Sequence, residues 1–315
     1  MESLNTPAPN LKVDTIVNAM TIDVEDYFHV AALSDVIKPN EWGKKYPLRI
    51  EKSTQRILEL LDNHQTKATF FILGWIAEAC PALIKEIAAH GHEVASHGFA
   101  HQQANKQTLG VFRDDVAKSK ALIESLTGKP VVGYRAPSFS IDTSNTWAFD
   151  VLKELGFLYT SSTYPVKHDL YGVPDWPRFK HRRPEGICEI PIPTLNKWGN
   201  NIPIGGGGYF RFYPYRLSRY LIQSFIKETG QPYSFYFHPW EIDPNQPRVA
   251  GITRKSQFRH YLNLNKMESR LERLLQDFKW NSMSHVYQLS RHEDNAKSIN
   301  TEVNRERAFI MGQLR

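Results

Sequence analysis

The sequence predicts an α/β fold in which seven or eight strands, each followed by a helix, form one barrel-like domain. Short β-branched and aromatic runs alternate with amphipathic stretches along the chain, a pattern typical of a parallel sheet. Residues 20–29 pass from an apolar strand into three acids, Asp23, Glu25 and Asp26. Ligands and catalytic groups collect at the carboxyl ends of parallel strands, so these acids indicate a site. Finally, no break in composition divides the 315 residues, and a single barrel can use most of that length.

The first half of the chain carries this alternation most clearly. Apolar residues recur at three- and four-residue spacing in the predicted helices, and the predicted strands are short runs of β-branched and aromatic residues. Pro81 in a first turn and Gly91 after a last turn mark the two ends of one helix. We expect strands within 16–22, 67–73, 92–96, 130–135 and 157–161, and helices at 49–64, 81–90, 110–126 and 144–155.

The second half continues the pattern with two long interruptions. Residues 164–185 and 198–208 lack periodicity. Long loops in a compact domain are usually functional or disordered, and the aromatic residues of 164–185 favour a functional role. We expect strands at 187–192, 233–238 and 284–289, and helices at 214–229 and 256–278. The predicted domain covers 12–290, with core motifs in 15–245 and a C-terminal extension over 246–290. The charged residues 291–315 would form a tail or a lone docking helix.

Composition excludes several classes of protein. Hydrophobic residues make up 41% and charged residues 23% of the chain, as in soluble globular proteins, and no run of 18 apolar residues could span a membrane. The N-terminal residues lack the basic and apolar regions of a secretory signal, so we expect a cytoplasmic protein without an integral membrane segment. Two cysteines, Cys80 and Cys188, are too few for a disulfide framework, and we expect both to be reduced packing residues.

The net charge of +6 gives only a weak indication of partners. Such a charge favours anionic glycans, lipid phosphates or nucleic acid. The basic residues are spread along the chain and no nucleic-acid-binding motif is present, which argues against a nucleic-acid partner. A glycan substrate is the expected partner, association with a membrane surface through a lipid-linked glycan stays open, and the sequence does not indicate the oligomeric state.

His97 and His101 form the first candidate metal-binding pair. They are four residues apart, so one helical turn would place both imidazoles within reach of one metal ion. The alternative is a pair of ordinary surface or core histidines. The neighbouring His92-Glu93 does not start the metalloprotease helix motif, because that motif requires a histidine three residues after the glutamate, whereas His97 follows Glu93 by four.

The acids after the first strand could complete such a metal site. Two histidines usually require a carboxylate as third ligand. Because side chains alternate along a strand, Asp23 and Glu25 should point to one side and Asp26 to the other. One member of the same-side pair could bind metal while the other acts as a general base.

Two further strand ends carry candidate catalytic residues. Arg135, which precedes Ala136-Pro137, could orient a buried carboxylate and hold it ionised. His238 follows an aromatic strand, at a position suited to a general acid that titrates near neutral pH. Each of these residues taken alone is more often structural.

Together these motifs resemble a known family, the polysaccharide deacetylases, also described as NodB-homology carbohydrate esterases or carbohydrate esterase family 4. The resemblance covers about residues 15–245 and rests on four motifs in order: Thr21-Ile22-Asp23 with Glu25, His97 to His101, Arg135-Ala136-Pro137, and Phe237-His238. Three further segments resemble the subgroup of bacterial exopolysaccharide loci, which has an additional C-terminal region: residues 23–28, residues 206–211, and His238-Pro239-Trp240-Glu241.

The resemblance implies a fold, a reaction and roles for residues. The fold is a deformed (β/α) barrel, and the reaction is the hydrolysis of N-acetyl groups on N-acetylhexosamine units of a glycan, with a divalent metal that is expected to be zinc. Asp23 would be the general base, Arg135 its tether and His238 the general acid, while His97 and His101 would bind the metal.

The first motif departs from the family pattern. The family commonly has two adjacent aspartates, the second of which binds metal, but here Val24 occupies that position. We therefore assign the third ligand to Glu25 and keep Asp26 as the alternative. Two other functions stay open, namely an allantoinase-like amidohydrolase that acts on small amides and a catalytically silent glycan-binding protein.

Several residues near these motifs are candidates for substrate binding. They are Tyr134, Pro137, Trp176 and Trp240. Trp176 and Trp198 could stack on sugar rings or pack beneath their own loops. The glycines of 205–208 lack the Lys-Ser/Thr of a phosphate-binding loop, so they would form a flexible wall of the cleft or a simple turn.

Overall fold

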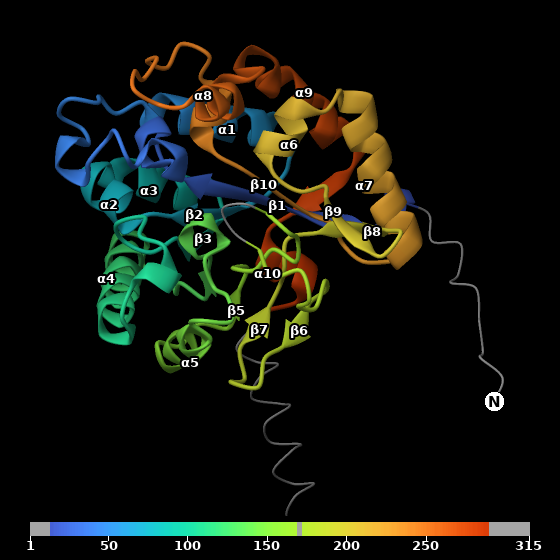
Figure 1. The fold of residues 1–315 in the computed structure, drawn as a ribbon, viewed down its shortest axis with the longest axis horizontal. Helices are drawn as coiled ribbons and strands as arrows, with labels where there is room; N and C mark the ends of the chain where they lie inside the picture. The colour runs from blue at the N-terminus through green and yellow to red at the C-terminus, as the bar shows by residue number, and fades with distance from the viewer. Residues whose placement is uncertain (1–12, 169–171, 290–315) are drawn as a thin grey trace, which may run out of the picture.

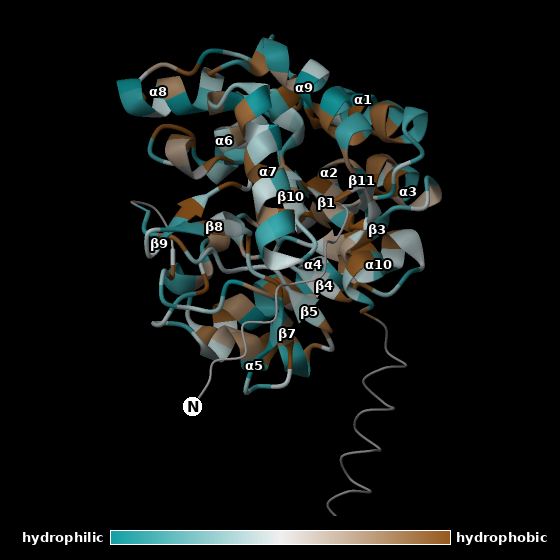
Figure 2. Ribbon diagram, turned by 90° about the vertical axis from the view of Figure 1, so that its right-hand side faces the viewer, coloured by the Kyte–Doolittle hydropathy of each residue, from teal (hydrophilic) through white to brown (hydrophobic). Residues whose placement is uncertain are grey.

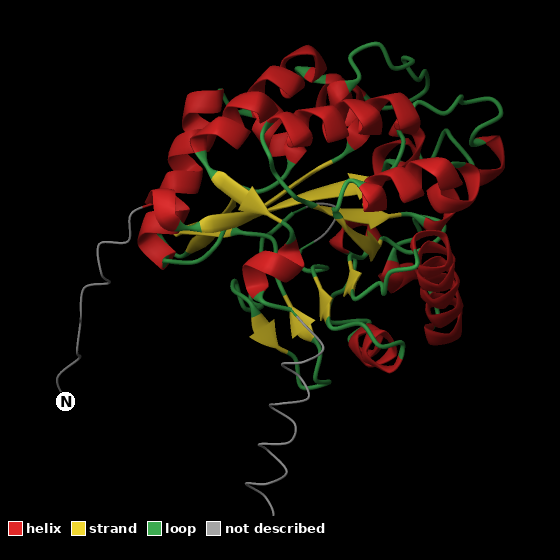
Figure 3. Ribbon diagram, turned by 180° about the vertical axis from the view of Figure 1, so that it is seen from behind, coloured by secondary structure: helices red, strands yellow, loops and turns green. Residues whose placement is uncertain are grey.

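A curled, mainly parallel sheet forms the centre of the molecule, shown by a computed structural model that describes residues 13–168 and 172–289. Its strand order is β10-β1-β2-β3-β4-β5-β7-β6, and β11 pairs with the first half of β1. The seven strands from β10 to β7 run parallel, and β6 lies antiparallel at one edge. The described residues do not join β6 to β10, so the barrel is open, and the predicted deformed (β/α) barrel is confirmed (Figure 3).

The strands of this sheet are short. Their bounds are β1 (Val17–Val24), β2 (Thr69–Ile72), β3 (Glu93–Ser96), β4 (Gly133–Tyr134), β5 (Tyr159–Thr160), β6 (His181–Arg182), β7 (Cys188–Glu189), β10 (Ser234–Phe237) and β11 (Lys279–Asn281). A separate antiparallel hairpin consists of β8 (Thr194–Lys197) and β9 (Asn200–Pro203).

Helices surround the sheet, and their outward faces are largely hydrophilic (Figures 1 and 2). They are α1 (Ile50–Asn63), α2 (Gly74–Ala79), α3 (Pro81–Ala89), α4 (Leu109–Thr127), α5 (Trp147–Glu154), α6 (Gly207–Phe212), α7 (Tyr215–Thr229), α8 (Arg254–Tyr261), α9 (Leu264–Asp277) and α10 (Met283–Tyr287). No helix of the described part is both long and apolar enough to cross a membrane.

The core has two layers because strand side chains alternate. The outer layer lies between the sheet and the helices. Met20 of β1 and Trp280 of β11 are two of its members. The inner layer fills the barrel and contains Phe71, Tyr159 and Met283, the last of which comes from α10. Burial of apolar surface in both layers stabilises the fold and fixes which side chains of β1 face inward.

Two helix predictions differ from the structure. The predicted helix over 256–278 is two helices, α8 and α9, separated at Leu262 and Asn263. Asn263 has a positive φ of 51° and donates a hydrogen bond from Nδ2 to the carbonyl of Arg211, so a tertiary contact ends α8. The short helix α2 was missed.

Other predictions in the second half were also wrong. The segment 198–208 is not wholly irregular, because it contains β9 and the start of α6. Residues 284–289 hold α10 rather than a strand, and the last strand, β11, lies just before it. The predicted tail over 291–315 lies outside the described residues, and the domain limits of 12–290 stay a prediction.

Candidate active site

The end of β1 delivers two buried carboxylates to the mouth of the barrel. Asp23 pairs in register with Phe71, whose ring lies in the inner core layer. After Val24 the chain turns, and the Glu25 amide donates a hydrogen bond to the carbonyl of Asp23 over 2.9 Å. Val24 points outward into the main core and is fully buried, so it cannot replace a ligand. Asp23 and Glu25 are 2% and 3% exposed and both face the site.

The two histidines converge through a loop rather than through a helix. His97 directly follows β3, and the chain then bends at Gly98, which has φ of 76°, and at His101, which has φ of 53°. The carboxylate of Asp115 on α4 accepts hydrogen bonds from the amides of Phe99 and Ala100 over 2.7 and 3.2 Å. These bonds hold the loop in a conformation that a non-glycine residue such as His101 rarely adopts.

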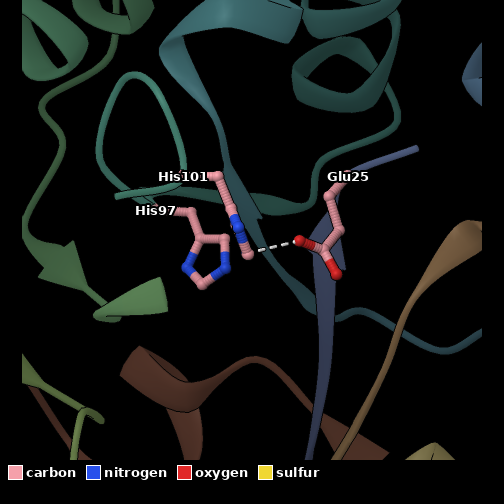
Figure 4. A group of neighbouring side chains, drawn as sticks. All are labelled: Glu25, His97 and His101. Atoms are coloured by element: carbon pink, nitrogen blue, oxygen red, sulfur yellow. Dashed lines mark ion pairs between the residues drawn. The ribbon is translucent and has the colours of Figure 1, made fainter. Parts of the chain in front are cut away.

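Glu25, His97 and His101 could together hold a metal ion (Figure 4). Each offers one ligand atom, and these atoms lie within 4.8 Å of one another. The Nδ1 atom of His97 lies 2.8 Å from the carbonyl of Arg135, an outer contact of the kind that orients metal-binding imidazoles. Glu25 Oε2 lies 2.6 Å from His101 Nε2, yet among the described residues it has no partner with hydrogen-bond geometry. The Glu25 oxygen and the His101 nitrogen therefore lie where both could bind one cation.

The protonation states of Glu25 and His97 also favour the binding of a metal ion. Burial raises the pKa of Glu25, but the neighbouring histidines outweigh this effect and hold that pKa well below its usual range. Burial lowers the pKa of His97 to about 4. A carboxylate and a neutral imidazole are the forms that bind a divalent metal.

Arg135, which directly follows β4, holds the carboxylate of Asp23. Its Nη1 atom donates to Asp23 Oδ1 over 2.6 Å, and both side chains are almost fully buried. Nη1 also reaches Thr21 Oγ1, and the other nitrogens donate to the carbonyl and the hydroxyl of Ser161. The guanidinium therefore fixes one oxygen of Asp23, while Oδ2 lies 3.9 Å from His238 Nε2.

His238 is held by a second buried pair. Its Nδ1 atom lies 2.8 Å from Glu241 Oε1, which also accepts from the backbone amide of His238. Glu241 Oε2 accepts from Arg211 Nε over 2.6 Å, and Arg211 donates to the carbonyls of Arg259, His260 and Leu262. These contacts turn Nε2 of His238 toward Glu25 Oε1, 3.3 Å away.

The charges around His238 favour its protonated form. Burial alone would lower its pKa, but Glu25, Glu241 and Asp23 outweigh burial and raise the pKa to about 9. The indole of Trp240 stacks on the imidazole at 5.3 Å and on His260 at 4.4 Å. His238 thus has the orientation and the charge of a proton donor.

Glycines make room for this arrangement. A Cβ atom at Gly207 would overlap the carboxylate of Glu241, and one at Gly206 would overlap the ring of Tyr236. Gly206 also has φ of 95°, which other residues rarely adopt. The glycine run therefore serves close packing behind His238, and of its members Gly208 lines the cleft.

The structure brings together most, but not all, of the predicted site residues. Asp23, Glu25, His97, His101, Arg135 and His238 meet in one place, and Trp240 lines the cleft beside them. Asp26 does not join the group, because its oxygens accept from the amides of Tyr27, Arg49 and Ile50 and so begin two helices.

Three predicted substrate-binding residues lie elsewhere. Tyr134 is buried against Phe112 and Phe157 in the outer core. Pro137 is buried and does not line the cleft. Trp176 packs against Phe149 and Arg183, also away from the cleft. Trp198 is 94% exposed at the tip of the β8–β9 hairpin.

The sequence did not reveal the roles of Glu241 and Arg211. Both belong to motifs that carried the resemblance, but 30 residues separate them, and neither spacing nor periodicity indicates that their side chains pair. Glu241 lies three residues after His238, a separation that a turn of 3-10 helix brings into contact. This three-residue spacing was the one feature of the sequence that could have indicated the contact between His238 and Glu241.

Comparison with known proteins links both halves of the chain to families. Residues 43–160 match the family described as polysaccharide deacetylase, and residues 161–288 match a domain of unknown function, DUF3473. The chain is 38% identical over 118 residues to a peptidoglycan deacetylase-like protein of Gibberella zeae, an alignment covering 37% of this chain and 34% of that protein. It is 33% identical over 112 residues to a peptidoglycan deacetylase of Helicobacter pylori, covering 36% and 37%. The chain thus spans about a third of the length of these relatives.

Solved structures share the fold at low sequence identity. A candidate polysaccharide deacetylase from Mycobacterium smegmatis aligns over 92% of this chain and 96% of its own, with 19% identity and a TM-score of 0.55. Puue allantoinase aligns over 90% and 93%, with 14% identity and a TM-score of 0.57. The fold therefore does not separate these two activities. The family matches are local: residues 43–160 form a segment that matches polysaccharide deacetylases, and a segment that matches DUF3473 follows it.

Proposed function

We propose that the protein is a metal-dependent hydrolase that removes N-acetyl groups from N-acetylhexosamine units of a bacterial polysaccharide or its precursor. The observation that carries this proposal is the convergence of Asp23 and His238 on the group of Glu25, His97 and His101. The relatives are named as deacetylases of peptidoglycan, a polymer that contains such sugars. We place the polymer in exopolysaccharide biosynthesis because the second set of motifs resembles that subgroup.

The chain's own residues can carry out the proton transfers of amide hydrolysis. A divalent ion held by Glu25, His97 and His101, which we expect to be zinc, would supply Lewis acidity to the acetyl carbonyl. Asp23, whose Oδ2 lies near His238, takes the proton of the attacking water as the carbonyl carbon gains its new C–O bond. His238 then donates the Nε2 proton to the leaving nitrogen as the C–N bond breaks. The products are acetate and a free amine.

Acetate release from acetylated chito-oligosaccharide tests the proposal. We expect release by the metal-loaded protein, loss of release on chelation, and loss in His97→Ala together with loss of bound metal by elemental analysis. His90→Ala is a matched control, because His90 lies at the protein surface and pairs with Asp62. Full activity of His97→Ala would contradict the metal assignment.

The same assay separates the two alternatives. Hydrolysis of allantoin without hydrolysis of the glycan would identify an amidohydrolase of small amides. Absence of bound metal, with glycan binding but without any metal-dependent hydrolysis, would identify a silent glycan-binding protein.

A further inference from the structure

The active-site cleft extends well beyond the catalytic residues. It has a volume of about 430 Å³, and one arm runs from His238 and Trp240 toward α6 and α8. These helices lie next to each other in both views, and Arg211 of α6 bonds to the carbonyl groups at the end of α8 (Figures 1 and 2). Both helices lie in the segment that matches DUF3473.

The side chains of this arm are mainly apolar. The arm is lined by Val30, Tyr209, Phe212, Phe258 and Leu262. The Phe212 and Phe258 rings are 6.5 Å apart at the mouth and remain 55% and 56% exposed. Exposed apolar side chains that adjoin a cleft mark a binding surface for an apolar group.

Cationic residues accompany the apolar side chains. Helix α8 has the sequence Arg-Lys-Ser-Gln-Phe-Arg-His-Tyr, which contains no acid, and both Lys255 and Arg259 line the cleft. Their charges complement an anionic group bound in the cleft. Phosphate is a common anion that joins a sugar to an apolar chain.

We propose, resting on the deacetylation proposed above, that the substrate is a glycan joined through phosphate to an apolar chain. The acetylated sugar lies at Glu25, His97 and His101, and the phosphate lies near Lys255 and Arg259. The apolar chain follows α6 and α8 past Phe212 and Phe258 to the mouth of the cleft.

A bare sugar chain fits this arm less well. Val30 and Leu262 have no flat face on which a sugar ring can stack and no hydrogen-bonding group. Phe212 and Phe258 could stack on sugars, but they lack the polar group with which tyrosine or tryptophan also bonds a hydroxyl. Of the five side chains of the arm, Tyr209 alone has a polar group, whereas an alkyl or isoprenoid chain can contact all five.

Three probes with the same sugar test the inference: diacetylchitobiose, its octyl glycoside, and its octyl phosphodiester, each below its micellar concentration. With metal-loaded protein we expect kcat/KM to rise about tenfold or more from the first to the second probe, because several methylene groups leave water. It should rise again for the phosphodiester.

Two variants test which side chains cause the preference for the octyl probes. Phe258→Ser should reduce the preference for octyl glycoside over free disaccharide toward one, and Lys255→Ala should reduce the further preference for the phosphodiester. Tyr220→Ser is the matched control, because Tyr220 is 63% exposed on α7 but does not line the cleft. Equal kcat/KM for the three probes would overturn the inference and leave the proposed function intact.

Two other measurements distinguish the remaining outcomes. Tighter binding of the octyl probes than of the disaccharide to His97→Ala, with no hydrolysis by the wild type, would support the inference and contradict the proposed function. Sedimentation with phosphatidylglycerol vesicles that contain no glycan, if lost in Phe258→Ser, would show that the arm contacts the membrane itself and would overturn the inference.

Discussion

Two buried arginine–carboxylate pairs face the active site from opposite halves of the chain. Arg135 pairs with Asp23, and Arg211 pairs with Glu241, both over 2.6 Å and both with side chains at most 3% exposed. Arg135 lies in the polysaccharide deacetylase match, whereas Arg211 and Glu241 lie in the DUF3473 match. The same chemical pair therefore occurs twice around one cleft.

The pairs differ in what their carboxylates still contact. Asp23 gives one oxygen to Arg135 and turns the other toward His238. Glu241 gives one oxygen to Arg211 and the other to the ring and amide of His238. In the proposed mechanism Asp23 exchanges a proton with the substrate, whereas Glu241 positions His238. One buried pair would then hold a reacting residue and the other a positioning residue.

Asp23→Asn should produce the largest effect. An amide keeps the contact with Arg135 but cannot accept a proton, so we expect kcat to fall by about 10²–10⁴-fold. Elemental analysis should show unchanged metal content, because Asp23 is outside the group that could bind metal. A variant that retains more than a tenth of wild-type kcat would show that Asp23 does not react, and the contrast with Glu241 would fail.

Arg211→Met should mainly reduce stability. It breaks the buried pair with Glu241, whose carboxylate then keeps only His238 as a cationic partner among the described residues, and breaking a buried pair typically costs about 3–5 kcal/mol of unfolding free energy. Urea unfolding measures this change. Arg219→Met is the matched control, because Arg219 pairs with Asp277 at 3.0 Å on the exposed surface of α7, and exposed pairs contribute about 0–1 kcal/mol. Equal losses of unfolding free energy in both variants would show that the buried pair contributes no more to stability than the exposed pair.

Glu189 offers a buried carboxylate to which no arginine of residues 13–168 and 172–289 is hydrogen-bonded. It accepts from the amides of Ser162 and Thr163, and burial raises its pKa to about 7. Because the pKa is higher in the folded than in the unfolded protein, its contribution to stability is complete below about pH 4.5 and is lost as pH rises toward 7. Urea unfolding at several pH values should show this decline, on the order of 2–3 kcal/mol, in the wild type.

Glu189→Gln provides the control for that pH dependence. Glutamine keeps an acceptor for the two amides but does not titrate, so the stability of the variant should lack this decline. Identical pH dependence in both proteins would mean that Glu189 has the same pKa in the folded and the unfolded protein.

Glu241→Gln should have a moderate effect on activity. The amide oxygen can still accept from His238, but the charge that pairs with Arg211 is gone. Loss of such an outer contact typically costs about 10–100-fold in activity. We expect the loss in kcat with little change in KM, and a larger loss in Glu241→Ala. Glu228→Gln, on an exposed pair with Lys197, is the control. A change confined to KM would contradict the positioning role.

The sequence predicted the alternation of strands and helices because each element has its own periodicity and end signals. It predicted the convergence of Asp23, His97, Arg135 and His238 because strand ends in a parallel sheet meet at one edge. It did not predict how the histidines converge, since the loop conformation depends on Asp115, a tertiary contact. The break between α8 and α9 and the pair of Arg211 with Glu241 were missed for the same reason: side chains distant in sequence determine both.

The smallest expected effect concerns what holds each arginine. Arg211 donates to three backbone carbonyls, whereas Arg135 relies partly on the hydroxyls of Thr21 and Ser161. Ser161→Ala removes only the 3.2 Å bond from Nη2, so we expect a loss of about 1 kcal/mol in urea unfolding and less than a tenfold loss in kcat. A loss as large as that of Arg211→Met would show that Arg135 depends on its hydroxyl contacts. The hydroxyl contacts of Arg135 would then contribute as much to stability as the backbone carbonyl contacts of Arg211.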